Sequence, residues 1–333
     1  MILVTGGTGL VGCHLLYLLI KKDKKVLALH RKNSNLEKVK KVFSSYSENS
    51  QKLFAKINWI EGDINDLESL SVAFKNIEEV YHCAAFISFD KRDLESMKKI
   101  NVEGTANMVN VALDNNIKKF CYVSTIAAIG LSTNKYTDEE TEWVDNSNPY
   151  SQTKKNAEME VWRGISEGLN ATIVNPGVII GSGFWKRGSG AFFTQISRGM
   201  NYYPTGKTGF ICVKDVVKIM HELMEKNIFS DRFILVAENW SFKKFFHHVS
   251  ISLNLTPPKK EAGKLLMIIA LILDFINSKI SGKRRKLNSS SIESSTSTSH
   301  YSNAKISSKL DYNFIKIEKS IEETCEVFKN QLN

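Results

Sequence analysis

A tyrosine and a lysine four residues apart, Tyr150 and Lys154, are the side chains of this 333-residue chain best suited to proton transfer. Pro149 favours the start of a helix, and residues four apart lie above one another on one helical face. A phenol titrates near pH 10, so a neighbouring ammonium that favours its ionised form would let Tyr150 exchange protons at neutral pH. The spacing alone is not decisive, because four other pairs share it: Tyr17/Lys21, Tyr203/Lys207, Tyr301/Lys305 and Tyr312/Lys316.

The glycine-rich segment that ends at Gly12 has the composition of a dinucleotide-binding loop. Its G-x-x-G-x-x-G spacing follows an apolar strand and opens a helix. Gly6 permits the tight turn, Gly9 lets the backbone approach a pyrophosphate, and Gly12 lets the helix pack closely on the sheet. The free N–H groups of the helix start would attract the phosphate oxygens. The residues expected at the cofactor here are Gly6, Thr8, Gly9, Leu10, Val11 and Gly12.

Short apolar runs alternate with helical patterns over the first half of the chain, which is typical of a parallel sheet covered by helices on both faces. We expect strands at 2–5, 26–30, 57–60, 79–83, 120–124 and 171–175. We expect helices at about 10–21, 34–46, 66–75, 91–115 and 150–167. The pattern predicts an α/β fold with a Rossmann-type, doubly wound parallel sheet. The Ser/Thr-rich tract 288–300 is expected to be a loop.

The composition is that of an ordinary globular protein, with 42% apolar and 24% charged residues. The formal net charge of +10 is spread along the chain rather than grouped with aromatic side chains, so we do not expect nucleic-acid binding. Five scattered cysteines, without a Cys-x-x-Cys motif or a Cys/His cluster, indicate neither a disulfide framework nor a metal site. We expect a cytoplasmic protein, because no signal peptide and no apolar run of membrane-spanning length is found.

The motifs, taken in chain order, resemble the extended short-chain dehydrogenase/reductase family. They are the glycine loop, Gly62-Asp63-Ile64, Tyr81-His82-Cys83-Ala84-Ala85, Asn101-Val102-Glu103-Gly104-Thr105, Val123-Ser124-Thr125 and the Tyr150/Lys154 pair. The branches that share them include NAD-dependent epimerases/dehydratases, dihydroflavonol reductases and 3β-hydroxysteroid dehydrogenases. The resemblance covers essentially the whole chain and weakens beyond about residue 180.

The resemblance implies roles for the polar residues. Tyr150 would be the general acid/base, and Lys154 would bind the nicotinamide ribose. A hydroxyl after the fifth strand would polarise the substrate carbonyl, and both Thr125 and Ser124 are candidates, with Thr125 favoured because the family's serine falls at that position. The resemblance gives Asn101 either a proton-relay role or a purely structural one.

The cofactor preference is inferred from the end of the second strand. NAD-selective members of such folds carry an acid there, whereas the 2′-phosphate of NADP requires a cation. This chain has His30-Arg31-Lys32, and Arg31 falls where dihydroflavonol-reductase-like members carry an arginine. NADP(H) is therefore preferred, and NAD(H) stays open. The resemblance places further residues beside the cofactor: Asp63, Ile64, Ala84, Ala85, Pro176 and Val178.

The resemblance also implies two domains and a reaction. Residues 1–175 would form the NADP-binding Rossmann domain, and 176–333 a smaller, mainly substrate-binding domain, of which 209–236 would pack back on the first. In the segment 206–216, Phe210 and its neighbours supply no arginine of the kind that binds sugar-nucleotide phosphates, so an apolar ketone, aldehyde or alcohol is the favoured substrate. The alternatives are a nucleotide-sugar epimerase or dehydratase and a non-catalytic, NADP(H)-sensing protein.

An apolar segment between basic flanks occupies residues 259–286, with a net charge of +6. At about 12 residues the apolar part is too short to span a bilayer. It is expected either to wall an apolar pocket or to make a weak contact with a membrane surface. The analogy with the family also leaves open a homodimer formed through helices 91–115 and 150–167.

Overall fold

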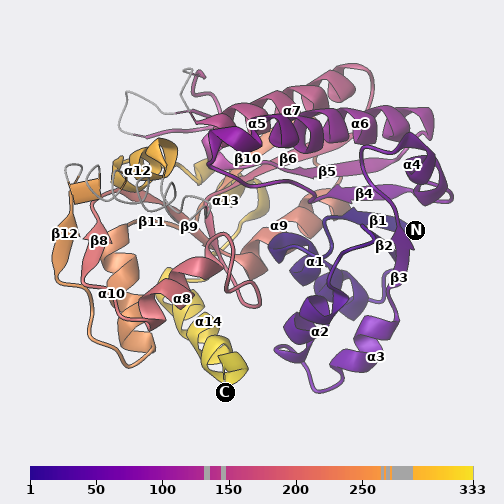
Figure 1. Ribbon diagram of the computed structural model, residues 1–333. Coiled ribbons are helices and arrows are strands. Elements are labelled where there is room, and N and C mark those ends of the chain that lie inside the picture. Colours follow the sequence, from indigo (N-terminus) through magenta and orange to yellow (C-terminus); the bar gives the residue numbers. More distant parts are fainter. Residues whose placement is uncertain (131–135, 144–147, 264–265, 268–270, 272–287, 333) are drawn as a thin grey trace.

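A seven-stranded sheet in which all neighbouring strands are parallel forms the centre of the computed structural model (Figure 1). The structure describes the whole chain except residues 131–135, 144–147, 264–265, 268–270, 272–287 and 333. The strands, in the order in which they lie, are β10 (Asp231–Leu235), β6 (Ala171–Pro176), β5 (Lys119–Val123), β4 (Glu79–His82), β1 (Ile2–Thr5), β2 (Val26–His30) and β3 (Asn58–Glu61). The α/β fold with a Rossmann-type parallel sheet is thereby confirmed.

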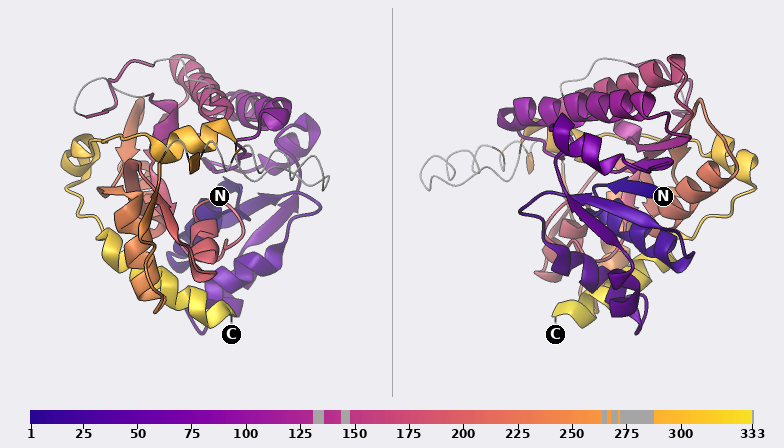
Figure 2. Two further views of the ribbon diagram at one scale, coloured as in Figure 1. Left: turned by 60° about the vertical axis from the view of Figure 1, so that its left-hand side comes forward. Right: turned by 90° about the vertical axis from the view of Figure 1, so that its right-hand side faces the viewer.

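Helices cover both faces of this sheet, as Figure 2 shows from two further sides. One face carries α1 (Leu10–Lys21), α2 (Leu36–Ser44), α3 (Ser50–Ala55) and α9 (Val213–Glu225). The other carries α4 (Leu67–Ala73), α6 (Gly104–Asp114) and α7 (Pro149–Ser166). Apolar side chains on both faces, such as Leu16 and Phe120, are fully buried, so the sheet is the common wall of two cores.

The expected long helix 91–115 is wrong in one respect, because it is broken. It consists of a 3-10 turn (Lys91–Asp93), α5 (Leu94–Met97), the π-helical turn η2 (Lys98–Glu103) and α6. The buried Asn101 lies in the π-helical turn, where its amide bonds to the backbone of Phe86 and to the Thr153 hydroxyl. The wider π-helical turn accommodates these hydrogen bonds. The periodicity of apolar residues does not predict such a turn.

The C-terminal half adds a smaller unit of mixed structure. Its strands are β7 (Val178–Ile180), β8 (Tyr202–Pro204), β9 (Lys207–Cys212), β11 (Glu238–Ser241) and β12 (Lys260–Ala262), and its helices are α8 (Gly190–Ser197), α10 (Phe242–Ser252), α12 (Ser289–Thr296), α13 (Ala304–Leu310) and α14 (Ile317–Leu332). An aromatic cluster that includes Phe193, Phe210, Phe245 and Phe328 holds it together. Helix α12 corrects the expectation of a loop at 288–300.

Two segments of the C-terminal half, β10 and α9, are part of the layer formed by the seven-stranded sheet and its helices. Strand β10 pairs in parallel with β6, and α9 packs against α1. None of the helices within the described ranges is long and apolar enough to cross a membrane. Most of the apolar segment expected to contact a pocket or a membrane surface, 265–276, lies outside those ranges.

Candidate active site

The motif residues gather at one edge of the sheet because they follow parallel strands. The glycine loop follows β1, Ala84 follows β4, Thr125 follows β5 and Pro176 ends β6. These four strands are neighbours in the sheet, so their carboxyl ends meet at the same edge. Tyr150 reaches this edge from the first turn of α7, whose N-cap, the Asn148 side chain, accepts hydrogen bonds from the first free backbone N–H groups.

The glycine loop passes within contact distance of the backbone after β4. Gly6 has φ +68°, and a Cβ there would lie 2.6 Å from the backbone of Cys83 and Ala84. A Cβ at Gly12 would lie 2.2 Å from the Gly6 carbonyl oxygen. Both positions therefore require glycine for the protein's own packing, before any ligand is considered.

Gly9 differs from these two glycines, and the difference fits a bound pyrophosphate. Among the described residues, a Cβ at Gly9 would come within 4 Å of a single atom, the Gly6 carbonyl oxygen at 3.2 Å. Gly9 is the N-cap of α1, makes no side-chain cap, and precedes a first turn without acidic residues. The helix therefore presents its N–H groups and positive dipole end to open space, as a phosphate requires. The half-buried Thr8, Leu10 and Val11 flank it.

Tyr150 and Thr125 lie together, and an aromatic ring lies beside them. The Thr125 side-chain hydroxyl lies beside the Tyr150 phenol, and the Phe89 ring packs edge-on against the tyrosine, with centroids 5.9 Å apart. Burial raises the pKa of Tyr150 to about 12, which the contact with Thr125 opposes only in part. The expected lowering of this pKa by Lys154 is therefore not found in the protein alone.

The reason is the direction in which Lys154 points. Its Nζ donates to the Tyr122 hydroxyl at 2.6 Å and to the Val123 carbonyl at 2.8 Å, and it lies 4.3 Å from the centre of the Tyr122 ring. Burial lowers the pKa of Lys154 to about 7, whereas the Glu158 carboxylate, one helical turn along α7, raises it. Lys154 thus lies on the helical face expected for it, but its ammonium contacts β5 instead of the Tyr150 phenol.

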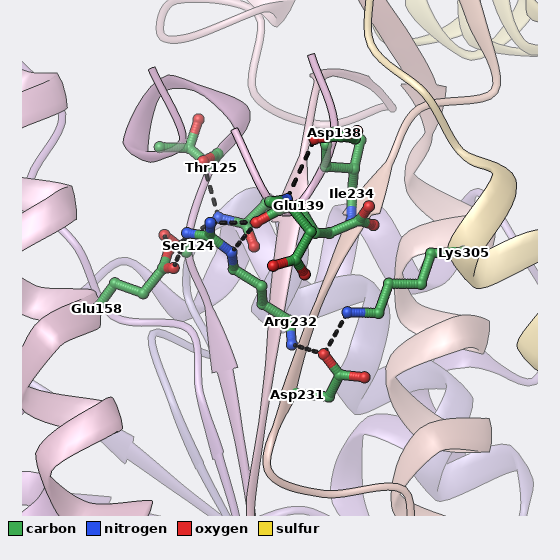
Figure 3. A network of polar contacts seen from close by, with 11 residues as sticks. Ser124, Thr125, Asp138, Glu139, Glu158, Asp231, Arg232, Ile234 and Lys305 are labelled. Atoms are coloured by element: carbon green, nitrogen blue, oxygen red, sulfur yellow. Dashed lines mark hydrogen bonds and ion pairs between the residues drawn. The ribbon is translucent and has the colours of Figure 1, made fainter. Parts of the chain in front are cut away.

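Ser124, the second candidate hydroxyl, points into a buried polar network (Figure 3). Its Oγ donates to Glu158 Oε2 at 2.6 Å, and the same oxygen accepts from Asn175 Nδ2 at 2.8 Å. The Asn175 amide also donates to the carbonyl oxygen of Thr125, at 3.1 Å. The network thereby fixes the backbone that carries Thr125, while Ser124 itself is engaged away from Tyr150.

An ion pair extends this network to the sheet edge. Arg232 Nη1 lies 3.2 Å from Glu158 Oε1, with the two side chains 22% and 3% exposed, respectively. The Arg232 guanidinium also donates to the Glu139 carbonyl oxygen, and the Glu139 carboxylate accepts from the backbone of Ile234 at 2.8 Å. Three distant parts of the chain, around 139, 158 and 232, are therefore held together behind the strand end that carries Ser124 and Thr125.

Asn101 is placed as a local clamp. Its side chain accepts from the Phe86 backbone N–H at 2.7 Å, donates to the Phe86 carbonyl at 3.0 Å, and donates to the Thr153 hydroxyl at 3.2 Å. These contacts join the loop after β4 to the first turn of α7. They support the structural reading of Asn101, because its amide group has no hydrogen left to donate.

The remaining residues expected at the cofactor occupy the same edge, with different exposure. Arg31 is exposed at the end of β2, and Ile64 is buried. The Asp63 carboxylate accepts from the backbone N–H two residues on, at 2.9 Å. Ala84 is half-buried and Ala85 exposed after β4. At the other end, Pro176 is buried and Val178 is half-buried; their contact with a nicotinamide stays a prediction, like the other cofactor contacts.

Three residues of the site were missed from the sequence: Tyr122, Glu158 and Arg232. Two had a usable signal. Tyr122 shares a strand face with Ser124 two residues later, and Glu158 follows Lys154 by four residues on α7. Arg232 had none, because only the pairing of β10 with β6 brings it to the site.

Comparisons with known proteins agree with this geometry. The sequence model of the NAD dependent epimerase/dehydratase family matches residues 2–236. A protein of Synechocystis sp. named "Putative dihydroflavonol 4-reductase" is 31% identical over 265 residues, 77% of this chain and 73% of its own. Sterol demethylase protein B of Methylococcus capsulatus is 26% identical over 243 residues, 71% of this chain and 70% of its own.

A solved structure has the same fold over its whole length. The UDP-glucose 4-epimerase of Thermotoga maritima, determined with UDP-glucose, superimposes with a TM-score of 0.78 at 21% identity. The match covers 100% of this chain and 99% of that one. At this identity the likeness concerns the fold, so the substrate must be argued from the site itself.

Proposed function

Since the chain belongs to the NAD-dependent epimerase/dehydratase family, we propose that it is an NADP(H)-dependent oxidoreductase that interconverts a ketone or aldehyde and its alcohol. The observation that carries the proposal is that Tyr150, in the first turn of α7, and Thr125, which follows β5, lie beside each other at the sheet edge that also carries the glycine loop. A proton donor beside a second hydroxyl is what a carbonyl oxygen needs as negative charge develops on it.

The chain's own residues divide the work. Gly6, Gly9 and the start of α1 would hold the pyrophosphate of the cofactor, whose nicotinamide supplies the hydride chemistry when bound. Tyr150 gives its phenolic proton to the substrate oxygen during reduction and takes it back during oxidation. Thr125 donates a hydrogen bond to the same oxygen. Lys154, by resemblance, binds the nicotinamide ribose, and its positive charge then favours the ionised phenol.

The preference for NADP(H) is proposed from the end of β2. Arg31 is exposed there beside Lys32, and no acidic residue is present between His30 and Ser34. A planar guanidinium suits the 2′-phosphate of NADP, and an acid would be needed to favour NAD. We expect Arg31→Asp to weaken NADPH binding by at least tenfold and to leave NADH binding nearly unchanged. Tighter binding of NADH than NADPH by the parent protein would contradict the proposal.

An apolar substrate is proposed from the residues around the site. The Phe89 ring packs on Tyr150. Phe210, at the position where a sugar-nucleotide phosphate would need a cation, is fully buried and stacks on Phe245 with centroids 4.9 Å apart. Two relatives carry names of enzymes for apolar molecules, a dihydroflavonol reductase and a sterol demethylase. These observations favour an apolar carbonyl compound over a nucleotide sugar.

The alternative of a nucleotide-sugar epimerase or dehydratase is favoured by the fold shared with a UDP-glucose-bound epimerase. A non-catalytic sensor is the third reading. All three are separated by following NADPH oxidation with a panel of apolar ketones and aldehydes, and product formation from UDP- and dTDP-sugars with NAD. Turnover of a carbonyl compound supports the proposal, conversion of a sugar nucleotide replaces it, and cofactor binding without any turnover favours the sensor.

Two variants tie any activity to the site. Tyr150→Phe should lower kcat by at least a hundredfold, because the proton donor is lost while the ring is kept. Tyr17→Phe is the matched control, since Tyr17 is also followed by a lysine four residues later but lies buried in the core on α1. Equal losses in both variants would exclude a special role for Tyr150.

A further inference from the structure

A chain of buried polar groups runs from the glycine loop to Lys154. The Thr5 hydroxyl, one residue before Gly6, lies 2.6 Å from His82 Nδ1. His82 Nε2 lies 3.1 Å from the Thr105 hydroxyl, and the His82 ring stacks on the Tyr122 ring with centroids 5.6 Å apart. The phenol accepts from Lys154 Nζ at 2.6 Å. Each of these five side chains is at most 1% exposed.

The donors and acceptors among these groups follow from the hydrogen bonds of Thr105 and the neutral ring of His82. Thr105 donates its one hydrogen to the Asn101 carbonyl at 2.5 Å, so it must accept from His82. Burial lowers the pKa of His82 to about 3, so its ring is neutral, and Nδ1 then accepts from the Thr5 hydroxyl. The Tyr122 oxygen accepts from the Lys154 ammonium, so the phenolic hydrogen itself points away from Nζ.

We propose that Tyr122 is a positioning residue that holds the Lys154 ammonium against the end of β5. A lysine side chain loses rotamer freedom when its end is fixed. An anchor for its end orders Lys154 before the cofactor arrives, which leaves less entropy to lose on binding. The inference deepens the proposed function, on which the cofactor-binding part of it rests.

The charged and titratable groups that face Lys154 come from three elements. They are Tyr122 on β5, His82 and Cys83 at the end of β4, and Glu158 and Tyr150 on α7. The Glu158 carboxylate, the Tyr122 hydroxyl and the Val123 carbonyl favour the charged form of the lysine, as does Cys83. Loss of the Tyr122 hydroxyl should therefore shift the titration of Lys154 to lower pH.

The test reads Lys154 directly. In protein labelled with 13C at the lysine side chains, NMR should show a resonance that titrates near neutral pH and is missing from Lys154→Arg. In Tyr122→Phe, which keeps the ring under the ammonium, we expect its midpoint to fall by about one pH unit. Lys154 keeps its second acceptor, the Val123 carbonyl, in this variant, so the resonance should still titrate.

Tyr81→Phe is the matched control, because Tyr81 is a buried tyrosine of the neighbouring strand on the opposite face of the sheet. It should leave the Lys154 midpoint unchanged. An unchanged midpoint in Tyr122→Phe, or an equal shift in Tyr81→Phe, would overturn the proposal. If Tyr122→Phe does not fold, the midpoint in Tyr122→Met, which also lacks the hydroxyl, decides.

A second readout connects the anchor with the cofactor. NADPH titrated into Tyr122→Phe should bind about tenfold more weakly than to the parent protein, and its binding to Tyr81→Phe should not change. Absence of NADPH binding to the parent protein would refute the proposed function and leave the NMR result valid. Unchanged NADPH binding in Tyr122→Phe would refute only the claim that Tyr122 orders Lys154 for cofactor binding.

Discussion

Replacing Arg232 by methionine should destabilise the protein by about 3 kcal/mol, because the Glu158 carboxylate would lose its cation. The two charges lie 3.2 Å apart, and the Glu158 side chain is 3% exposed. Removal of one partner from a buried ion pair costs about 3–5 kcal/mol. We expect the lower end of this range because Ser124 and Asn175 still donate hydrogen bonds to the carboxylate.

The assay is urea unfolding followed by circular dichroism, with the free energy of unfolding extrapolated to water. Arg163→Met is the control. Arg163 pairs with Glu160 and Glu167 on the surface of α7, and its side chain is 35% exposed. An exposed ion pair of this kind contributes about 0–1 kcal/mol, although Arg163, like Arg232, pairs with glutamate through its guanidinium group.

A second substitution identifies the charge as the cause. In the Arg232→Met background, Glu158→Gln should restore about half of the lost stability, because an amide tolerates burial without a cation. Two results would refute the reasoning: a loss in Arg232→Met no larger than in Arg163→Met, or no recovery in the double variant. Either would mean that Arg232 acts through packing, not through the charge of Glu158.

Three further predictions follow from the same geometry. Gly9→Ala should weaken NADPH binding and should lower the melting temperature less than Gly12→Ala does, since the added Cβ would lie 3.2 Å from the Gly6 carbonyl oxygen in the first variant and 2.2 Å from it in the second; equal losses of melting temperature would contradict this. Because the pKa of Lys154 is lowered to about 7 in the folded protein, the unfolded chain holds the extra proton from about pH 7 to 10, so stability should rise with pH there by at most about 1.4 kcal/mol per unit. Lys154→Met should lack this rise in calorimetry, and parallel profiles would refute it. Asn101→Leu should cost about 1–3 kcal/mol in urea unfolding, because the Phe86 backbone loses two hydrogen bonds; a loss below about 0.5 kcal/mol would show that water replaces them.

The parallel sheet was predictable because its signals are local. Apolar runs such as that of β5 and the glycine spacing after β1 are encoded by adjacent residues, and the structure has strands within one or two residues of the expected ranges. The π-helical turn around Asn101 was not predictable in this way. It depends on contacts with Phe86 and Thr153, which lie 15 and 52 residues away.

The same distinction between local signals and long-range contacts applies to the candidate site. The sequence by itself determined which residues reach the carboxyl edge of the sheet, because a residue that follows a parallel strand must lie there. It also placed Tyr150 and Lys154 on one helical face. Only the tertiary structure decided where their polar atoms point: Tyr150 towards Thr125, and Lys154 towards Tyr122. The physical reason is burial, because a charged group removed from water takes the nearest acceptors that the fold supplies, whatever their distance in the chain.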